Sequence, residues 1–390
     1  MTGADKLSVL GGLAQFDASA GRLSEQRPMR TGRTGAAPYD GVYYSFAPDG
    51  QCIPLFKVLM TNRCELDCAY CANRCARSVR RAAFSPDELA DTFIDMYRAG
   101  IVTGLFLSSG IVGGADRAME PMIAAVELVR RKHRFKGYIH LKVLPGASQE
   151  AVRRACRLAD RVSVNIEAPT QDSLDHIAPK KSLREDVIKR FRWIDEERRS
   201  HHVVRAGTTT QLVVGAAGET DAEILRSVTW MYGHVGLHRA YYSAFAPVDN
   251  TPLEDRAATP PERENRLYQA DWLLRYYGFE LDELPFDQNG YLPLDVDPKL
   301  AWAQRHPERF PVELNDAEFD ELLRVPGIGK RSAGRILRAR EAGKLRSPED
   351  VGKMGVLVRR AWPYVVVGGK RFAMLDRPSP EQLDLFAPEM

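Results

Sequence analysis

Short apolar runs alternate with amphipathic stretches through the middle of the chain, from residue 54 to residue 245. Each apolar run has the length of one strand, and each amphipathic stretch repeats its apolar residues at the spacing of a helix. The predicted strands are 54–60, 103–109, 137–143, 161–166, 208–214 and 238–245. The predicted helices are 85–99, 119–131, 148–159, 183–199 and 220–232. This alternation predicts an α/β fold of parallel βαβ units, as a partial six-stranded barrel or a doubly wound sheet, with functional loops at the carboxyl ends of the strands.

The pattern changes on both sides of this region. Residues 1–50 are rich in Gly, Ala and Arg and have few periodic apolar positions, so they are predicted to be an N-terminal extension of a barrel over 51–250. Residues 251–314 are rich in Pro and aromatic side chains and predict a connecting segment with one helix over 260–277. A small all-α domain is expected over 315–372, and a tail over 373–390.

Composition and charge narrow the class of protein. The 390 residues are 44% hydrophobic and 27% charged, which is typical of a folded globular protein. No apolar run approaches the ~20 residues that span a bilayer, and the N-terminus lacks a signal-peptide pattern, so a cytoplasmic protein without a membrane partner is expected. Residues 321–372 carry 13 Lys or Arg against 4 Asp or Glu, a net charge of +9 in a chain of net charge +3. That asymmetry indicates either a polyanionic partner or a solvated basic face.

Four of the six cysteines fall within twelve residues. Cys64, Cys68 and Cys71 have the spacing C-x3-C-x2-C directly after the first predicted strand. Three thiolates are soft ligands for an iron–sulfur cluster and leave one iron of a cubane open, whereas zinc knuckles present two cysteine pairs. Cys75 is either a fourth ligand that closes the cluster or, as we favour, a residue one helical turn away that does not ligate. Cys52 and Cys156 are expected to be ordinary thiols.

With an aromatic residue, Tyr70, before the third cysteine, this motif resembles that of the radical S-adenosylmethionine (SAM) superfamily. The resemblance implies a [4Fe–4S] cluster whose open iron binds SAM, and Tyr70 near the adenine. One electron from the cluster then cleaves the sulfonium and releases a 5′-deoxyadenosyl radical. The alternative is a structural zinc or iron–sulfur knuckle.

Polar and Gly-rich segments at later strand ends extend this resemblance. Ser109 and Gly110 follow the second strand, where the superfamily has a Gly-rich segment that meets the SAM amino group; a plain tight turn is the alternative. Alternation places Ser163, Asn165 and Glu167 on one face of the fourth strand, and residues at this place hold the ribose in related enzymes. The cofactor-binding candidates at the strand ends are therefore Ser109, Gly110, Asn165, Glu167 and Gln211 of the fifth strand.

Two further side chains are expected to face a substrate rather than SAM. His140 and Lys142 lie at the end of the third strand and are inward candidates.

A second motif lies in the basic C-terminal part. The run Pro326-Gly327-Ile328-Gly329-Lys330-Arg331 resembles the hairpin of a helix-hairpin-helix motif. Its backbone N–H groups and the second helix's N-terminus would hold phosphate oxygens, beside the charges of Lys330 and Arg331. Such contacts read no sequence, so weakly specific, salt-sensitive binding is expected, to DNA rather than RNA. A degenerate copy follows at 345–356, and a protein-contact hairpin is the alternative.

Both motifs together, over about 41–369, resemble the family described as DNA modification or repair radical SAM proteins. Members tend to accompany a uracil-DNA-glycosylase-like protein. The resemblance implies a radical enzyme acting on DNA, with an electron donor such as flavodoxin or ferredoxin. A non-catalytic DNA-binding protein with a structural cluster and an RNA-modifying radical SAM enzyme are the alternatives.

Overall fold

The computed structural model describes residues 2–14, 40–46, 52–343 and 345–371. The chain divides into two compact units, Met1–Glu264 and Asn265–Met390, with the boundary in the first turn of helix α9 (Pro261–Tyr276). The predicted tail over 373–390 and most of the predicted extension over 1–50 lie outside the described residues.

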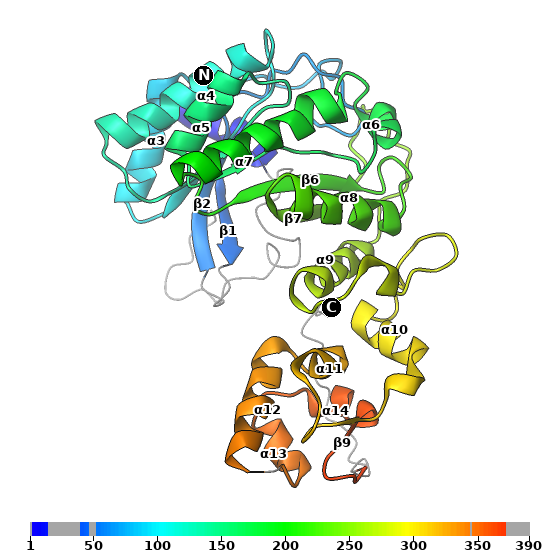
Figure 1. The fold of residues 1–390 in the computed structure, drawn as a ribbon. Helices are drawn as coiled ribbons and strands as arrows, with labels where there is room; N and C mark the ends of the chain where they lie inside the picture. The colour runs from blue at the N-terminus through cyan, green and yellow to red at the C-terminus, as the bar shows by residue number, and fades with distance from the viewer. Residues whose placement is uncertain (1, 15–39, 47–51, 344, 372–390) are drawn as a thin grey trace. The chain divides into compact units, whose positions relative to one another are not determined.

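The first unit is built on one seven-stranded sheet with strand order β1 to β7 (Figure 1). Neighbouring strands from β2 to β7 are parallel, and β1 pairs antiparallel with β2 at one edge. The sheet curls into a half-barrel, which confirms the α/β class and the partial barrel. The strands are β1 (Val42–Phe46), β2 (Cys52–Leu59), β3 (Gly104–Ser108), β4 (Tyr138–Lys142), β5 (Arg161–Ser163), β6 (Thr208–Val214) and β7 (Leu237–Ala244).

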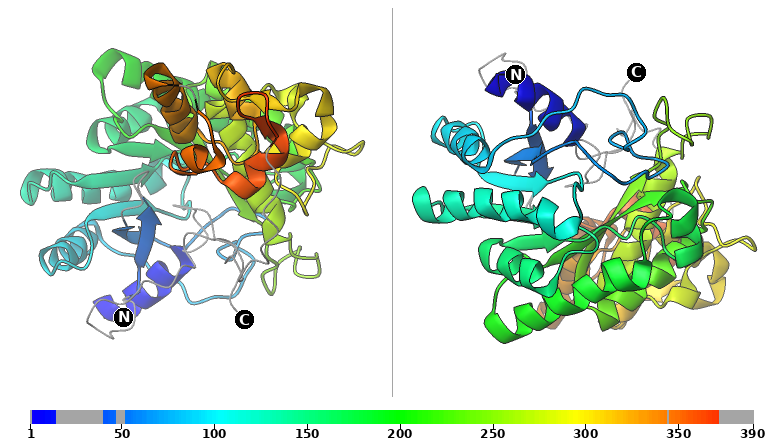
Figure 2. Two further views of the ribbon diagram at one scale, coloured as in Figure 1. Left: turned by 90° about the horizontal axis from the view of Figure 1, so that it is seen from below. Right: turned by 90° about the horizontal axis from the view of Figure 1, so that it is seen from above.

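Helices connect successive parallel strands and cover one face of the sheet (Figures 1 and 2). Ser85, Ser148 and Thr220 cap α3, α5 and α8, each accepting a hydrogen bond from a first-turn backbone N–H, which is the chemistry their sequences predict. The helices of this unit before α9 are α1 (Gly3–Leu13), α3 (Pro86–Arg98), α4 (Ala115–Glu127), α5 (Gln149–Leu158), α6 (Gln171–Ile177), α7 (Lys189–His201) and α8 (Asp221–His234), with π-helical turns η2 (Leu128–Lys132) and η3 (Leu183–Ile188).

The two faces of the sheet differ in chemistry because successive strand residues point to opposite sides. On the helix-covered face, Phe56 of β2 stacks against Phe93 of α3 with ring centroids 6.3 Å apart. On the other face, Lys57 of β2 lies over the Phe106 ring, which in turn stacks on His140 of β4. The apolar core therefore lies between sheet and helices, and the concave face is left to polar side chains.

The structure differs from the sequence prediction in several places. Helix α6 was not predicted, and the domain expected to be all-α contains β9 (Val365–Val366), which pairs in parallel with β8 (Val312–Glu313). The fourth predicted strand extends to residue 166, but β5 ends at Ser163, because the following residues leave the ladder and Glu167 adopts a left-handed φ of 62°. Helix α1 and strand β1 were not predicted. Thr2 caps α1 through a capping box with Asp5, and α1 packs on β2, but the Gly- and Arg-rich sequence around them hid both elements.

The second unit contains short helices around a core of its own. Buried Leu322, Ile328, Ile336 and Val351 belong to that core, against which Tyr277 also packs. The elements after α9 are η4 (Leu281–Glu283), α10 (Pro298–Arg305), η5 (Pro307–Arg309), β8 (Val312–Glu313), α11 (Phe319–Arg324), α12 (Lys330–Ala342), α13 (Pro348–Gly352), α14 (Val358–Ala361), η6 (Trp362–Tyr364) and β9 (Val365–Val366). Among the described residues, no helix has both the length and the apolar character needed to cross a membrane.

Candidate functional site

The three motif cysteines lie in one irregular loop between β2 and α3, at the carboxyl end of the sheet's second strand. The loop is tied to the segment that follows β3. The backbone N–H of Glu65 donates to the Ile111 carbonyl at 2.7 Å, and the Glu65 carboxylate accepts from the N–H groups of Gly113 and Gly114 at 2.8 and 2.9 Å. The Gly-rich segment predicted to bind SAM is thus also the support of the cysteine loop.

Gly110 shows why this segment needs a small residue. A Cβ atom added here would lie 2.0 Å from the Arg63 carbonyl oxygen and 3.3 Å from Cβ of Cys64. The nearest obstacle is backbone, which cannot rotate away as a side chain can. The Gly110 position is therefore explained by contact with the cysteine loop, and its role toward SAM stays a prediction. The neighbouring Ser109 is half-buried, and its hydroxyl donates to the Gly110 carbonyl at 2.8 Å.

We expect Gly110→Ala to displace the cysteine loop. Overpacking of this kind costs about 1–3 kcal/mol in free energy of unfolding, and iron bound per protein should fall with it. Gly233→Ala is the matched control, because Gly233 lies in α8 with nothing within 4 Å of an added Cβ. Iron content and denaturant unfolding of both variants measure the effect. Wild-type iron content and stability in Gly110→Ala would contradict the assignment.

Arginines next to the cysteines stabilise the loop rather than reaching outward. The Arg81 guanidinium donates to four loop carbonyls, two of which belong to Asn62 and Asn73, at 2.5 and 2.9 Å. Arg74 pairs with Asp67 at 2.6 Å, and Arg77 donates to the Asp249 carbonyl at 2.8 Å. These guanidinium groups satisfy backbone oxygens that no regular secondary structure would pair.

The thiols are placed as ligands of a cluster would be. Cys68 is buried, Cys64 and Cys71 are half-buried, and Cys75 is exposed. Burial raises the pKa of Cys71 to about 12, and charge on Cys68 raises it further; burial also raises the pKa of Cys68, which the neighbouring Lys181 partly offsets. Positive metal ions remove this penalty, because a coordinating thiol is deprotonated. The buried, mutually close thiols therefore fit a cationic cluster.

The same residues fit a single metal ion less well. Within the described ranges, no three His, Cys, Asp or Glu side chains converge as ligands of one ion do. Each cysteine of a cubane binds a different iron, so cluster ligands need not meet at one point. Residues 71–75 form turns rather than a helix, so the expectation that Cys75 lies one helical turn from Cys71 was wrong. Whether Cys75 ligates stays open.

A buried ion pair beside the cysteine loop joins the end of β5 to the segment that follows α6. Lys181 Nζ lies 3.2 Å from Glu167 Oε1, and both side chains are below 10% exposed. The Asn165 amide contacts the other Glu167 oxygen at 3.5 Å. Tyr70 lies next to Glu167 and the cysteines. Burial, and then the charges of Glu167, Cys68 and Cys71, raise the pKa of Tyr70 well above its usual value. The structure therefore brings the predicted Tyr70, Asn165 and Glu167 together beside the cysteines.

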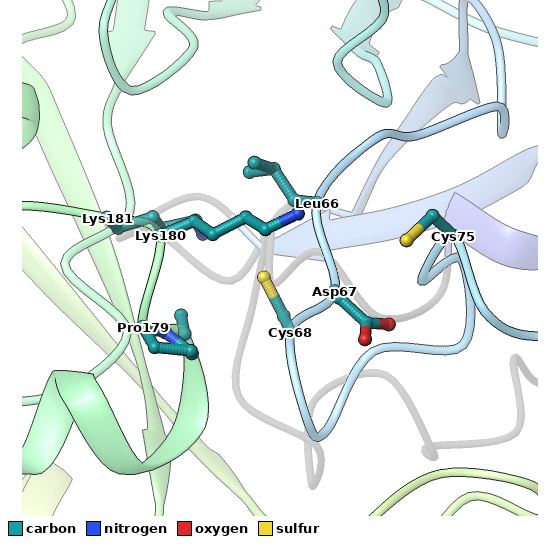
Figure 3. Close-up of a pocket in the computed structure, with 8 residues that line it drawn as sticks. Leu66, Asp67, Cys68, Cys75, Pro179, Lys180 and Lys181 are labelled. Atoms are coloured by element: carbon teal, nitrogen blue, oxygen red, sulfur yellow. The ribbon is translucent and has the colours of Figure 1, made fainter.

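A pocket of about 190 Å³ opens next to this ion pair (Figure 3). Both Cys68 and Cys75 line it, with Lys180 and Lys181 on the opposite wall, and the Cys68 thiol points toward the lysine side chains. Lys180 Nζ lies 3.4 Å from the Glu65 carbonyl, so this lysine also closes onto the cysteine loop. The pocket gives the cysteine loop one solvent-accessible side.

A second set of polar side chains lies on the concave face of the half-barrel. Lys142, Ser163, Asn165 and Gln211 line one small depression on the concave face, and the Gln211 amide donates to Ser243 at 3.0 Å. Asn165 belongs both to this depression and to the pair beside the cysteines. The predicted cofactor-binding residues Asn165 and Gln211 thus line the same depression as Lys142, which was predicted to face the substrate.

His140 lies beside this depression, fully inside the protein. Its Nε2 is 2.9 Å from the Ser163 hydroxyl, and its ring stacks on Phe106 with centroids 4.2 Å apart. Burial, followed by the charges of Arg161, Lys142 and Lys57, lowers the pKa of His140 well below its usual value. The imidazole is therefore neutral at physiological pH.

Sequence reasoning missed three residues of this site. Lys57 is 1% exposed in the middle of an apolar strand, and a charge in such a run is itself a signal of an inward functional position. Lys181 follows a short helix, and its ion pair could not be read from the sequence. The role of Arg81 could not be read from the sequence, since its four carbonyl partners lie up to 19 residues away.

In the second unit, the predicted hairpin is the turn between α11 and α12. Pro326 and Ile328 are buried, and Gly327 has a φ of 84° with its carbonyl accepting from Leu357 N–H at 3.0 Å. Gly329 is the N-cap of α12 and supplies no side-chain cap. Lys330 and Arg331 are exposed at the first turn of α12. The turn leaves backbone donors and two cations on one helix end.

Lys299 of α10 supports this turn from behind. Its Nζ donates to the Ile328 carbonyl at 2.6 Å and lies 4.8 Å from the Tyr277 ring centroid. Burial lowers the pKa of Lys299 to about 7. The hairpin backbone is thus held by a buried side chain from outside the motif.

Comparisons with known proteins show what the chain is similar to. The model of the Radical SAM superfamily matches residues 58–231. Similar solved structures include HydG, a maturase of the [FeFe]-hydrogenase (10% identity, TM-score 0.46, 55% of this chain and 48% of that chain), and methylornithine synthase PylB (12%, 0.44, 54% and 59%). Another is the radical SAM methyltransferase TsrM from Kitasatospora setae with cobalamin and [4Fe–4S] cluster bound (13%, 0.38, 54% and 49%). The chain spans about half the length of these structures. Among curated proteins, no sequence match was found.

Proposed function

We propose that this protein, whose residues 58–231 match the Radical SAM superfamily model, is an enzyme that uses a [4Fe–4S] cluster and SAM to modify or repair DNA. When bound, the cofactors supply a 5′-deoxyadenosyl radical that abstracts a hydrogen atom from the substrate. Cys64, Cys68 and Cys71 would hold the cluster, and the residues around Glu167 would hold SAM. Radical SAM enzymes need an electron donor, and a flavodoxin or ferredoxin would serve here.

The main support for a nucleic-acid substrate is the turn over 325–329 in the second unit. It ends at the N-terminus of α12, where the N-cap residue Gly329 supplies no side chain and Lys330 and Arg331 are exposed in the first turn. Backbone N–H groups at a helix N-terminus bind phosphate, and adjacent cations strengthen this attraction. The sequence around the turn carries the net charge of +9 noted above. A polymer of phosphates is the partner that this end of α12 would bind most strongly.

The charges on the concave face of the half-barrel are a second, independent support for an anionic substrate. Strands β2 to β7 contain no Asp or Glu, whereas Lys57, Lys142 and Arg239 lie on the face opposite the helices. The neutral His140 adds a hydrogen-bonding group without negative charge. A surface of this sign attracts phosphate and repels cationic substrates.

The two sets of residues give separate roles to the two units. The turn over 325–329 would contact the DNA backbone without reading its sequence, and the polar side chains of the half-barrel would contact the nucleotide to be modified. A base inside a duplex cannot reach a buried radical, so the target nucleotide would have to be unpaired or flipped out. A uracil-DNA-glycosylase-like protein is a proposed partner that would act on the same DNA.

The test measures 5′-deoxyadenosine formed anaerobically by the reconstituted full-length protein, with dithionite and SAM, and with DNA or RNA oligonucleotides. We expect DNA to raise the rate. Lys330→Ala/Arg331→Ala should require more DNA for the same stimulation and should reduce the slope of log affinity against log salt by about 2. Arg226→Ala, an exposed arginine of α8, is the control. Stimulation by RNA alone would overturn the DNA assignment, and a rate indifferent to both polymers would overturn the proposed function.

A further inference from the structure

Two exposed aromatic rings lie beside the turn over 325–329. Trp272 and Tyr276 of α9 are 50% and 38% exposed, and their ring centroids are 4.4 Å apart. They are one helical turn apart and so share one face of the helix. Burial of large aromatic rings is strongly favourable in water, so two neighbouring exposed rings indicate a surface that binds something. We call this pair the α9 aromatic pair.

Tyr277, the residue after this pair, lies between Trp272 and the hairpin. The pKa of its hydroxyl is raised by burial and lowered in part by the neighbouring Trp272 side chain and the backbone N–H of Lys330. The same hydroxyl oxygen would lie only 3.1 Å from a Cβ atom added at Gly329. Tyr277 is thus next to both Trp272 and the first residue of α12. The rings and the hairpin form one surface within the second unit.

Cations surround the pair. Lys330 Nζ lies 5.6 Å from the Tyr276 ring centroid, and the Arg275 guanidinium carbon lies 4.7 Å from it. Arg275 is itself held by Asp271 at 2.5 Å and donates to the Tyr276 hydroxyl at 2.9 Å. A cation at this distance is attracted to the electron-rich face of the ring, and it also attracts phosphate. The surface therefore combines π faces with positive charge.

We propose that the α9 aromatic pair stacks an unpaired nucleobase whose flanking phosphate is bound at the adjacent turn over 325–329. Grooves that combine aromatic faces with cations bind single-stranded nucleic acid, because every base has a π face and every linkage a negative charge. A continuous duplex offers no free base face, so the pair selects single strands, duplex ends or flipped bases. This inference rests on the proposed function and deepens it, because it makes the bound substrate an unpaired nucleotide.

The test compares binding of a fluorescent single-stranded oligonucleotide and of a hairpin-closed duplex to the full-length protein. Trp272→Ala should weaken single-strand binding about tenfold, as loss of one stacking contact does, and leave duplex binding within about twofold. Trp272→Phe should restore most of the affinity, because it keeps a π face. Trp230→Ala is the matched control, since Trp230 of α8 is also exposed, at 40%, and stacks on His234 instead.

The outcomes separate this inference from the function on which it rests. Equal losses for single strand and duplex in Trp272→Ala would mean a general structural role and would overturn the stacking proposal. Unchanged single-strand affinity in Trp272→Ala would overturn the stacking proposal as well. In both cases, DNA binding by the wild-type protein would leave the proposed function standing. A wild-type protein that bound neither polymer would instead remove the proposed function itself.

Discussion

Cys68→Ala is expected to abolish cluster binding and, with it, formation of 5′-deoxyadenosine. Cys68 is 7% exposed and packs in the cluster of buried residues that includes Ile177, Ala168 and Phe245, so its thiol is held in a fixed position. Changes to residues behind a metal ligand already cost about 10–100-fold in affinity, and loss of a ligand should cost more than about 100-fold. Iron and sulfide per protein, visible absorption and anaerobic product formation measure the outcome.

Cys75→Ala in the same experiment decides the role of the fourth cysteine. Cys75 is exposed, and its backbone N–H donates to the Leu66 carbonyl at 3.0 Å, a contact that the substitution keeps. A cluster held by three cysteines remains in Cys75→Ala and keeps an open iron for SAM. If Cys75→Ala also lost the cluster, or if Cys68→Ala kept both cluster and activity, the three-cysteine assignment would be wrong.

Lys181→Met is expected to be among the most destabilising single substitutions in the first unit. It leaves the Glu167 carboxylate buried without its cation, and such losses typically cost about 3–5 kcal/mol in free energy of unfolding. Glu167 also holds a left-handed backbone conformation that only its surroundings maintain. Denaturant unfolding of the cluster-free protein measures the cost separately from any effect on the cofactors.

A double-mutant cycle identifies the ion pair as the cause. Lys181→Met/Glu167→Gln removes both charges and should recover most of the stability lost in Lys181→Met, because no unpaired charge remains. Lys180→Met, at the exposed neighbouring lysine, should change the free energy of unfolding by less than about 0.5 kcal/mol. Additive losses in the double variant would show that the two charges do not stabilise each other.

The sequence by itself determined the elements of the half-barrel and the chemistry of the cysteine loop. Alternating apolar runs and capped amphipathic helices are local patterns, so Ser85, Ser148 and Thr220 marked helix starts correctly. The C-x3-C-x2-C spacing is also local, and the Radical SAM superfamily model matches residues 58–231 around it. The short β1 and α1 were missed, because β1 depends on pairing with β2 and α1 on packing against β2, and neither has a clear apolar periodicity of its own.

Only the tertiary structure decided how distant polar groups are paired. The Glu167–Lys181 ion pair, the contact of Gly110 with Arg63 and the four carbonyls bound by Arg81 each join residues brought together by strand order, not by spacing. The same holds in the second unit, where Tyr277 lies between Trp272 and the first residue of α12. Hydrophobic periodicity indicates which side of a helix or strand is buried. Long-range hydrogen bonds and ion pairs depend instead on which helices and strands come into contact, and a single sequence does not show those contacts directly.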